Sequence, residues 1–437
     1  MKKTNKALFE FLNNSPSQFH AIANQAAKLE EAGYKRLLEQ KPFKLEAGGK
    51  YFVTRNNSSL IAFRIPKKEY QSFMVMASHS DSPTFRIKEN PEMVEEKHFV
   101  KLNCEKYGGM LMATWFDRPL SIAGRILVKD EKTGAIKEQL VNIDKNLVMI
   151  PSLAIHMNRE ANEGYKYNAQ KDTLPLMTMD ADIKLMDVVA KEAGVSAESI
   201  IGKDLFLYNR DKATLWGAKD EFISSGRIDD LECAFASLEG FLEAKDNKSA
   251  ITMHCVFDNE EVGSGTKQGA DSTFLSDVME RINEALGFGG SKLKEAIASS
   301  MMLSADNAHS VHPNYGEKSD PTNRVYMNEG IVIKYNANQK YTTDGVSAAL
   351  FTEICKAAEV PTQVFVNRSD SAGGSTLGNI STAHVSLNSV DIGLAQLSMH
   401  SCFETAGAKD AHFMVLAATK FFESHIEISD MGIYNIK

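Results

Sequence analysis

The sequence predicts an α/β fold in which a mostly parallel central sheet is flanked by helices. Several short, almost uninterrupted apolar runs each stop at a group of polar residues, and helical patterns lie between them. Such apolar runs are typical of strands buried on both faces, as in a parallel sheet. At 437 residues the chain is also longer than a single core usually supports, so a second domain or a large insertion is expected.

Three helices are expected around this sheet. The first covers residues 17–40, where apolar residues recur on one side and charged residues on the other. The second begins at Ile228 and the third follows Gly345. Asp229 would lie in the first turn of the second helix, where the helix dipole favours an acidic residue, so an ordinary helix cap is one interpretation of this side chain.

Four apolar runs are expected to form strands that end in polar residues. In open parallel sheets, ligands bind beyond the carboxyl ends of the strands. The sequence therefore predicts a functional site at one edge of the sheet. The runs are 73–77, before His79 and Asp81; 251–257, before 258–261; 300–303, before Asp306; and 364–366, before 367–370.

A change of texture between residues 91 and 224 predicts an inserted domain. Turn-rich and charged connections dominate this stretch, and the parallel-sheet pattern resumes after it. That return favours an insertion over a terminal extension. The main domain would then comprise residues 1–90 and 225–437.

The composition argues against several classes of partner and compartment. With 49 basic and 57 acidic residues, and no basic run interleaved with aromatics, nucleic acid is not expected as a partner. No signal peptide and no apolar run long enough to span a bilayer is found, so no membrane association is expected. The five cysteines are scattered without a CxxC pair, which favours reduced thiols and a cytoplasmic protein.

Glu260 and Glu261 form the most informative pair in the chain. Adjacent carboxylates at the end of an apolar run repel one another, and a bound cation would neutralise at least one of them. Taken alone, such a pair is more often a solvated acidic turn. The remaining strand ends and later segments add further metal-ligating residue types, which makes the turn a weaker interpretation.

Together these positions form a set of nitrogen and oxygen ligands without a thiolate. Such a set suits catalytic Zn²⁺, Mn²⁺ or Co²⁺, and its size accommodates two ions more easily than one. Each histidine taken singly could be an ordinary core or surface residue, and His309 and His312 are left out of the set. Because residues i and i+2 of an extended segment face the same way, Asp81 could orient the imidazole of His79. The set consists of His79, Asp81, Asp229, Glu260, Glu261, Asp306 and His400.

Short motifs along almost the whole chain match one enzyme family. In order, they are SPSQFH at 15–20, SHSDSP at 78–83, YGG at 107–109, TWFDR at 114–118, RID at 227–229, DNEEVGS at 258–264, SAD at 304–306, HSVHPNY at 309–315 and MHS at 399–401. With these motifs the chain resembles the M18 metalloaminopeptidases, the aspartyl aminopeptidase family. One motif alone would be weak evidence, whereas several in the same order are specific.

The resemblance implies a role for each residue of the set. His79, Asp229, Glu261, Asp306 and His400 would bind two divalent metal ions, most often zinc with manganese or cobalt as alternatives, and Asp229 would bridge them. Glu260 would be the general base and Asp81 would orient His79. The reaction would release the N-terminal amino acid from peptides with a free amino terminus.

The resemblance also implies an assembly. The inserted domain would be β-rich and mediate dimerisation, and dimers would assemble into a tetrahedral dodecamer with enclosed active sites. His156, in the segment PSLAIH at 151–156, would reach the active site of a neighbouring subunit. An interface or surface histidine without a catalytic role is the alternative.

The substrate preference is the least determined property. Lys334 matches a position that can meet an acidic side chain, so N-terminal Asp or Glu is the expected preference and a neutral residue such as Leu the rival. A solvated surface lysine is the alternative for Lys334. The chain departs from the family pattern at 110–113 and in the loop 367–376. The resemblance therefore does not determine which residues line the substrate pocket, although it does determine the metal ligands.

Two other functions remain as alternatives. A related dinuclear deacylase or carboxypeptidase would use the same metals on a different bond. A non-catalytic assembly protein would keep the metals only as structural ions. The intact pair Glu260 and Glu261 argues against the second alternative, because a vestigial site need not keep its base.

Overall fold

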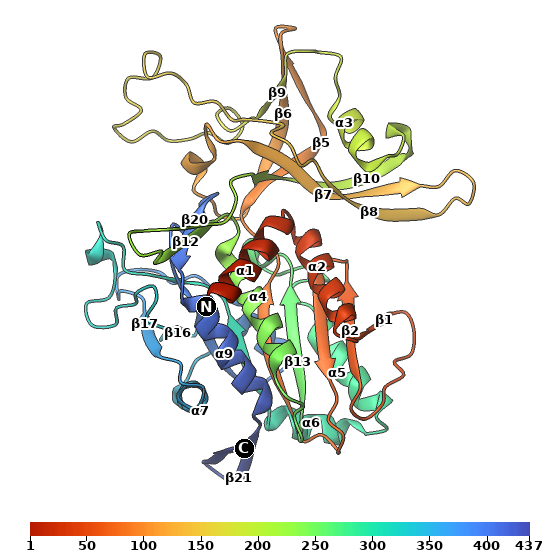
Figure 1. The fold of residues 1–437 in the computed structure, drawn as a ribbon, viewed down its shortest axis with the longest axis vertical. Helices are drawn as coiled ribbons and strands as arrows, with labels where there is room; N and C mark the ends of the chain where they lie inside the picture. The colour runs from red at the N-terminus through yellow and green to blue at the C-terminus, as the bar shows by residue number, and fades with distance from the viewer.

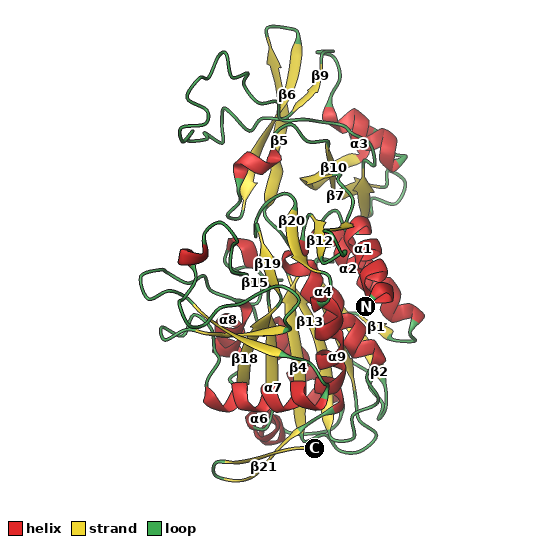
Figure 2. Ribbon diagram, turned by 60° about the vertical axis from the view of Figure 1, so that its left-hand side comes forward, coloured by secondary structure: helices red, strands yellow, loops and turns green.

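The chain folds into two large sheets with a smaller one between them. The computed structural model describes residues 1–437. A nine-stranded sheet forms the lower part of the view in Figure 1, and a six-stranded sheet forms the upper part. A five-stranded sheet lies between the two in both ribbon views (Figures 1 and 2).

The nine-stranded sheet has a parallel centre and mixed edges. Strands β13, β4, β14 and β18 run parallel, whereas β3 and β16 pair antiparallel to this centre. Three predicted apolar runs form β13, β4 and β14. In order across the sheet the strands are β1 (Lys35–Leu37), β2 (Lys50–Arg55), β3 (Ser59–Arg64), β13 (Ala250–Phe257), β4 (Ser72–His79), β14 (Met301–Ala305), β18 (Asn388–Gly393), β16 (Ile331–Tyr335) and β17 (Thr362–Val366).

The fourth apolar run differs from the expectation. It forms β17 at the edge of the sheet, parallel to β16, and since β16 runs against β18, β17 runs against the central strands. Val364 is 43% exposed there. Strand β17 is only partly buried, and its direction is set by its pairing with β16, which an apolar run cannot reveal.

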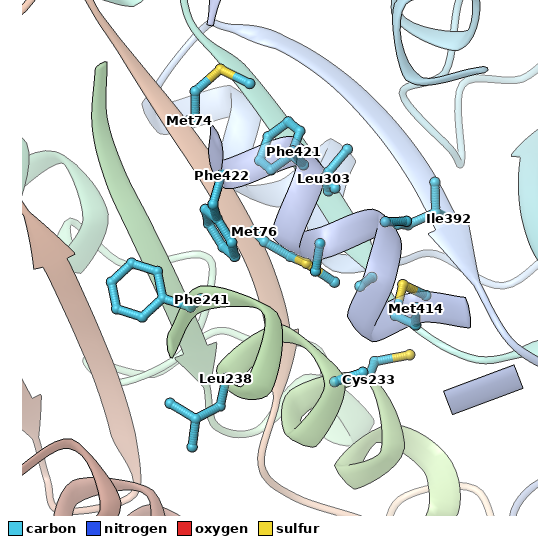
Figure 3. Packing of buried hydrophobic residues seen from close by; sticks show 14 of the residues in the cluster. Met74, Met76, Cys233, Leu238, Phe241, Leu303, Ile392, Met414, Phe421 and Phe422 are labelled. Carbon is cyan, nitrogen blue, oxygen red and sulfur yellow. The ribbon is translucent and has the colours of Figure 1, made fainter. Parts of the chain in front are cut away.

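Helices cover both faces of the sheet, which confirms the predicted α/β class. Phe241 of α4 meets Phe422 of α9 beside Met74 and Met76 of β4, as Figure 3 shows. On one face lie α2 (Gln18–Glu31), α4 (Ile228–Glu243), α7 (Gly345–Ala357) and α9 (Asp410–Glu423); on the other lie α5 (Phe274–Ala285), α6 (Gly290–Ala298) and α8 (Leu377–His384). Helix α1 (Lys2–Asn14) packs against α2 and α4.

The helix predicted over residues 17–40 is shorter in the structure. Helix α2 ends at Glu31, and the chain turns through Gly33, whose φ of +83° favours glycine. Residues 35–37 then pair with β2 as the edge strand β1. Pairing with a distant strand, which local periodicity cannot reveal, therefore ended this helix early.

The six-stranded sheet is antiparallel throughout. Its strands, in order across the sheet, are β8 (Ile136–Asn142), β7 (Leu120–Lys129), β10 (Ile200–Asn209), β5 (Thr84–Glu95), β6 (Phe99–Tyr107) and β9 (Leu176–Thr178), with α3 (Leu185–Ala193) beside them. It has its own buried cluster, which includes Phe85, Trp115 and Leu205. The expected insertion spans 91–224, whereas this sheet runs from Thr84 to Asn209; the division into two domains stays a prediction.

The five-stranded sheet joins segments from far apart in the chain. Its order is β11 (Thr214–Trp216), β12 (Phe222–Ser225), β20 (Glu404–Gly407), β19 (Ala395–Leu397) and β15 (Ala308–His309). Strand β12, which crosses the expected end of the insertion at residue 224, therefore pairs with β20 from the C-terminal part of the chain. A hairpin of β21 (Ile426–Asp430) and β22 (Ile433–Ile436) ends the chain. No helix here combines the length and the apolar character that crossing a membrane would require.

Candidate active site

Polar residues from six segments meet at the carboxyl end of the central strands. In the parallel register, His79 at the end of β4 lies opposite Phe257 of β13, and Ala77 lies opposite Ser304 of β14. The residues that follow β13 and β14 are thereby brought beside His79. A cavity of about 350 Å³ opens there, lined among others by His79, Asp229, Glu260, Glu261, Asp306, Lys334 and His400.

Asp229 lies between two imidazoles. Its Oδ1 is 3.4 Å from Nε2 of His79, and its Oδ2 is 3.4 Å from Nε2 of His400. The latter nitrogen is also 3.4 Å from Oε2 of Glu261. Asp229 and Asp230 have non-helical dihedral angles at the start of α4, so Asp229 does not act as an ordinary residue of the first helical turn.

The buried oxygens at this point fit divalent metal ions. Asp229 Oδ1 and Glu261 Oε1 are buried and have no hydrogen-bond partner in the chain, a costly arrangement that a cation would relieve. Three groups of side chains could each hold a metal ion, because the ligand atoms inside each group all lie within 4.8 Å of one another. Asp229 belongs to two of these groups. The groups are His79, Asp229, Asp230 and Asp306; His79, Glu260 and Glu261; and Asp229, Glu261 and His400.

Burial and mutual repulsion oppose ionisation of most of these carboxyl groups. Burial, reinforced by Asp306 and other nearby carboxylates, raises the pKa of Glu260 to about 8. Burial likewise raises the pKa of Glu261 and of Asp306 above the ordinary range. Burial acts on Asp229 in the same direction, but the neighbouring imidazoles of His400 and His79 outweigh it and hold its pKa below the ordinary value. A cation favours the charged form of every carboxylate here.

Asp81 holds the loop that carries the two glutamates. Its carboxylate accepts hydrogen bonds from the backbone N–H of Glu260 at 3.1 Å and of Glu261 at 3.2 Å, and from the hydroxyl of Tyr107 at 2.7 Å. Nδ1 of His79 lies 3.4 Å from Asp81 Oδ1 and 3.1 Å from the backbone carbonyl oxygen of Asp81. The nearer acceptor for this imidazole is therefore the backbone carbonyl.

Comparison with known proteins identifies the family. The family model described as "Aminopeptidase I zinc metalloprotease (M18)" matches residues 11–422. The chain belongs to the M18 family. A relative from Clostridium acetobutylicum named "Probable M18 family aminopeptidase 2" is 47% identical over 426 residues, covering 95% of this chain and 98% of the relative. A relative of the same name from Pseudomonas aeruginosa (strain UCBPP-PA14) is 42% identical over 429 residues, covering 96% and 98%.

Solved structures agree with this assignment. The structure described as "Cryo-EM structure of the Ape4 and Nbr1 complex" has a TM-score of 0.94 and 36% identity, covering 97% of this chain and 86% of that one. The aminopeptidase I structure from Clostridium acetobutylicum shares the fold at 23% identity and a TM-score of 0.79, covering 94% and 93%. The predicted resemblance is confirmed, and the M18 protein is a metalloaminopeptidase, a hydrolase rather than a non-catalytic assembly protein.

Two residues expected to meet substrate lie in different settings in this M18 chain. Lys334 is 3% exposed in the cavity wall, so it is not a solvated surface lysine. Its Nζ donates to the backbone carbonyl of Asn307 at 2.9 Å and lies 3.7 Å from Oδ2 of Asp306. His156 is exposed, does not line the cavity, and belongs to an irregular segment that follows residue 150.

Two buried carboxylates beside the M18 site were missed from the sequence. Oδ2 of Asp230 accepts from the backbone N–H of His79 at 3.0 Å. Glu404 accepts from the backbone N–H of Asp229 at 3.1 Å and of His400 at 2.8 Å. Asp230 adjoins a predicted ligand and could have been considered, whereas Glu404 follows no apolar run that ends in a polar cluster. Other cavity-lining residues that were not predicted include His309, Tyr341, Phe365 and the segment 374–376.

Proposed function

We propose that this M18 metalloaminopeptidase uses two divalent metal ions that share Asp229, with Glu260 as the general base. The observation that carries the proposal is the position of Asp229, whose two oxygens face two different imidazoles at 3.4 Å while Oδ1 has no hydrogen-bond partner. His79 and Asp306 would serve one ion, and Glu261 and His400 the other. The zinc metalloprotease family favours zinc, and the nitrogen and oxygen ligands also accept manganese or cobalt.

Within this proposal, each side chain has a defined task. When bound, the metal ions would polarise the scissile carbonyl and lower the pKa of water. Glu260 faces the cavity and would take a proton from the attacking water and deliver it to the leaving amine nitrogen. Asp81 would keep Glu260 in place through the hydrogen bond that its carboxylate accepts from the backbone N–H of Glu260. The product would be one free amino acid from the N-terminus of a peptide.

The two adjacent glutamates allow a matched test. We expect Glu260→Gln to lower kcat by about 100- to 10,000-fold, the range for loss of a general base, while the metal content stays at the wild-type value. Glu261→Gln should instead weaken metal binding by at least about tenfold, since it removes a ligand. Metal content is measured by mass spectrometry on each purified variant. Full activity in Glu260→Gln with its metals bound would refute the base assignment.

We propose a preference for acidic N-terminal residues, with neutral residues such as Leu as the rival. The support is the buried ammonium of Lys334 in the cavity wall, near the ring of Tyr341. A carboxylate side chain in the cavity would gain from this positive charge. The charge is already shared with Asp306, so the gain is expected to be moderate.

A substrate panel tests this preference. Chromogenic Asp, Glu, Leu and Ala derivatives are compared with added Zn²⁺, Mn²⁺ or Co²⁺ and with a chelator control. In Lys334→Met we expect kcat/KM for Asp and Glu to fall about tenfold more than for Leu. A wild-type enzyme that favours Leu would support the rival preference, and an equal loss on all four substrates would remove Lys334 from specificity.

We also propose a cytoplasmic homo-oligomer, built from dimers into a tetrahedral dodecamer. One similar structure is described as "Structure of S. cerevesiae mApe1 dodecamer", with 28% identity, a TM-score of 0.86 and 97% of each chain covered. The five cysteines here are all free and buried, which agrees with a reducing compartment. Light scattering on the purified protein measures the assembly size, and a monomer would contradict the proposed dodecamer.

A further inference from the structure

Two loops without regular secondary structure form part of the cavity wall. The loop 336–344, between β16 and α7, contributes Tyr341, and the loop 367–376, between β17 and α8, contributes Gly374, Ser375 and Thr376. The second loop is also where the sequence departs from the family pattern. Because neither loop has a strand or helix of its own, other contacts must hold its position.

A single buried carboxylate ties both loops to the central sheet. Asp391 lies in β18 with no exposed surface. Its Oδ2 accepts from the backbone N–H of Thr342 at 2.5 Å and from the hydroxyl of Thr342 at 2.8 Å. Its Oδ1 accepts from the hydroxyl of Thr376 at 2.5 Å, and its own N–H donates to the hydroxyl of Thr343 at 2.9 Å. Hydrogen bonds to an ionised carboxylate are stronger than neutral ones.

The Asp391 carboxylate is closely packed against the start of α8. A Cβ atom at Gly378, in the first turn of α8, would lie 2.8 Å from both oxygens of Asp391 and 3.0 Å from the hydroxyl oxygen of Thr342. The hydroxyl oxygen of Thr342 also lies 2.9 Å from that of Ser389. The helix that follows the second loop can therefore approach β18 only because residue 378 has no side chain.

We propose that Asp391 is a positioning residue for substrate selection, holding Tyr341 and Thr376 in the geometry that admits the substrate's N-terminal side chain. Asp391 does not line the cavity, so it acts through the two loops and touches no reacting atom. Because these loops lie at the cavity wall and not at the reacting atoms, a displacement of about 1 Å is expected to change substrate positioning and binding. This inference rests on the proposed use of the cavity as the substrate site.

Asp391→Asn tests the inference with little change of shape. The amide keeps one acceptor oxygen, and its NH₂ group must face hydrogen-bond donors at Thr342 or Thr376. We expect KM for the preferred aminoacyl substrate to rise about tenfold, and discrimination between acidic and neutral substrates to shrink. The metal content and kcat should stay within about twofold of wild type, and hydrogen–deuterium exchange should rise in both loops.

Matched variants separate this role from general destabilisation. Thr376→Val replaces the hydroxyl with a methyl group and should raise KM and the exchange of the second loop, whereas Thr376→Ser keeps the hydrogen bond and should leave both near wild type. Asn388→Ala, in the same strand, removes a bond to the carbonyl of Ser300 but touches neither loop, so it should behave as wild type. If Asp391→Asn does not fold, the Thr376 pair decides by the same readouts.

Two results would overturn the proposal. Unchanged exchange in both loops of Asp391→Asn would show that the carboxylate does not hold them. Raised exchange with unchanged KM and unchanged discrimination would show that the loops do not select substrate. Failure of the proposed metal chemistry would appear instead in wild type, as activity that resists the chelator, and the loop exchange would still report on Asp391.

Discussion

The cavity at the central sheet and the exposed loop 151–157 differ in how far one chain completes them. At the cavity, Asp81 accepts hydrogen bonds from the backbone N–H groups of Glu260 and Glu261, and Asp229 lies 3.4 Å from two imidazoles. In the loop, Leu153 is 57% exposed and Met157 is 74% exposed. Large apolar side chains exposed together mark an interaction surface. The proposed metal site is thus built from one chain, whereas these apolar side chains of the loop are exposed in a single chain.

The largest effect is expected where the cavity is broken at its shared carboxylate. Asp229→Asn removes the charge that faces both imidazoles, so we expect kcat/KM to fall more than about a thousandfold and the metal content to drop. Both are measured on the same purified sample. His384→Ala is the control, since this partly exposed histidine pairs with Asp271 outside the cavity. A metal-loaded, active Asp229→Asn enzyme would contradict the shared-ligand proposal.

A smaller effect is expected from the loop side of the comparison. If His156 completes a neighbouring subunit's site, His156→Ala should lower kcat/KM by roughly tenfold while the assembly size by light scattering stays unchanged. The matched control is His98→Ala, because His98 is also exposed and lies between β5 and β6 of the six-stranded sheet. Wild-type activity in the intact oligomer of His156→Ala would leave the loop with an interface role only.

The smallest effect concerns the pH dependence of stability. Buried carboxyl groups lie at the cavity and not in the loop 151–157, so only the cavity should contribute to this dependence. Burial raises the pKa of Glu260 and of Glu404 to about 8, from ordinary values of 4.5. Between about pH 5 and 8 the unfolded chain has released these protons while the folded chain still holds them, so stability falls as pH rises. The lowered pKa of Asp229 lies below this window and adds nothing to the slope.

Thermal unfolding measures this prediction. We expect Tm of the metal-free protein to fall by at least about 2 °C from pH 5 to pH 8, and added Zn²⁺ to raise Tm more at pH 8, because fewer protons must then leave the ligands when the metal binds. The loop 151–157 holds no carboxyl group, so Met157→Ser should leave the slope unchanged. A flat or rising Tm without metal would contradict the assigned pKa directions.

Local patterns were sufficient for the centre of the fold. The runs that form β4, β13 and β14 are buried on both faces, so their sequences are almost uninterrupted apolar runs. The same pattern failed for β17, because an edge strand is partly exposed and its direction depends on β16. The helix expected over 17–40 was also too long, since the pairing of β1 with β2 ended it.

The kinds of chemical group in the site could be read from the chain, and their arrangement could not. Adjacent glutamates and histidines at strand ends predicted a metal-type site because repelling carboxylates need a cation. That Glu404 supports Asp229 and His400, or that Asp391 joins two loops, depends on hydrogen bonds between segments far apart in the chain. Such contacts leave no local periodicity, because their partners meet only when the sheets and helices have packed.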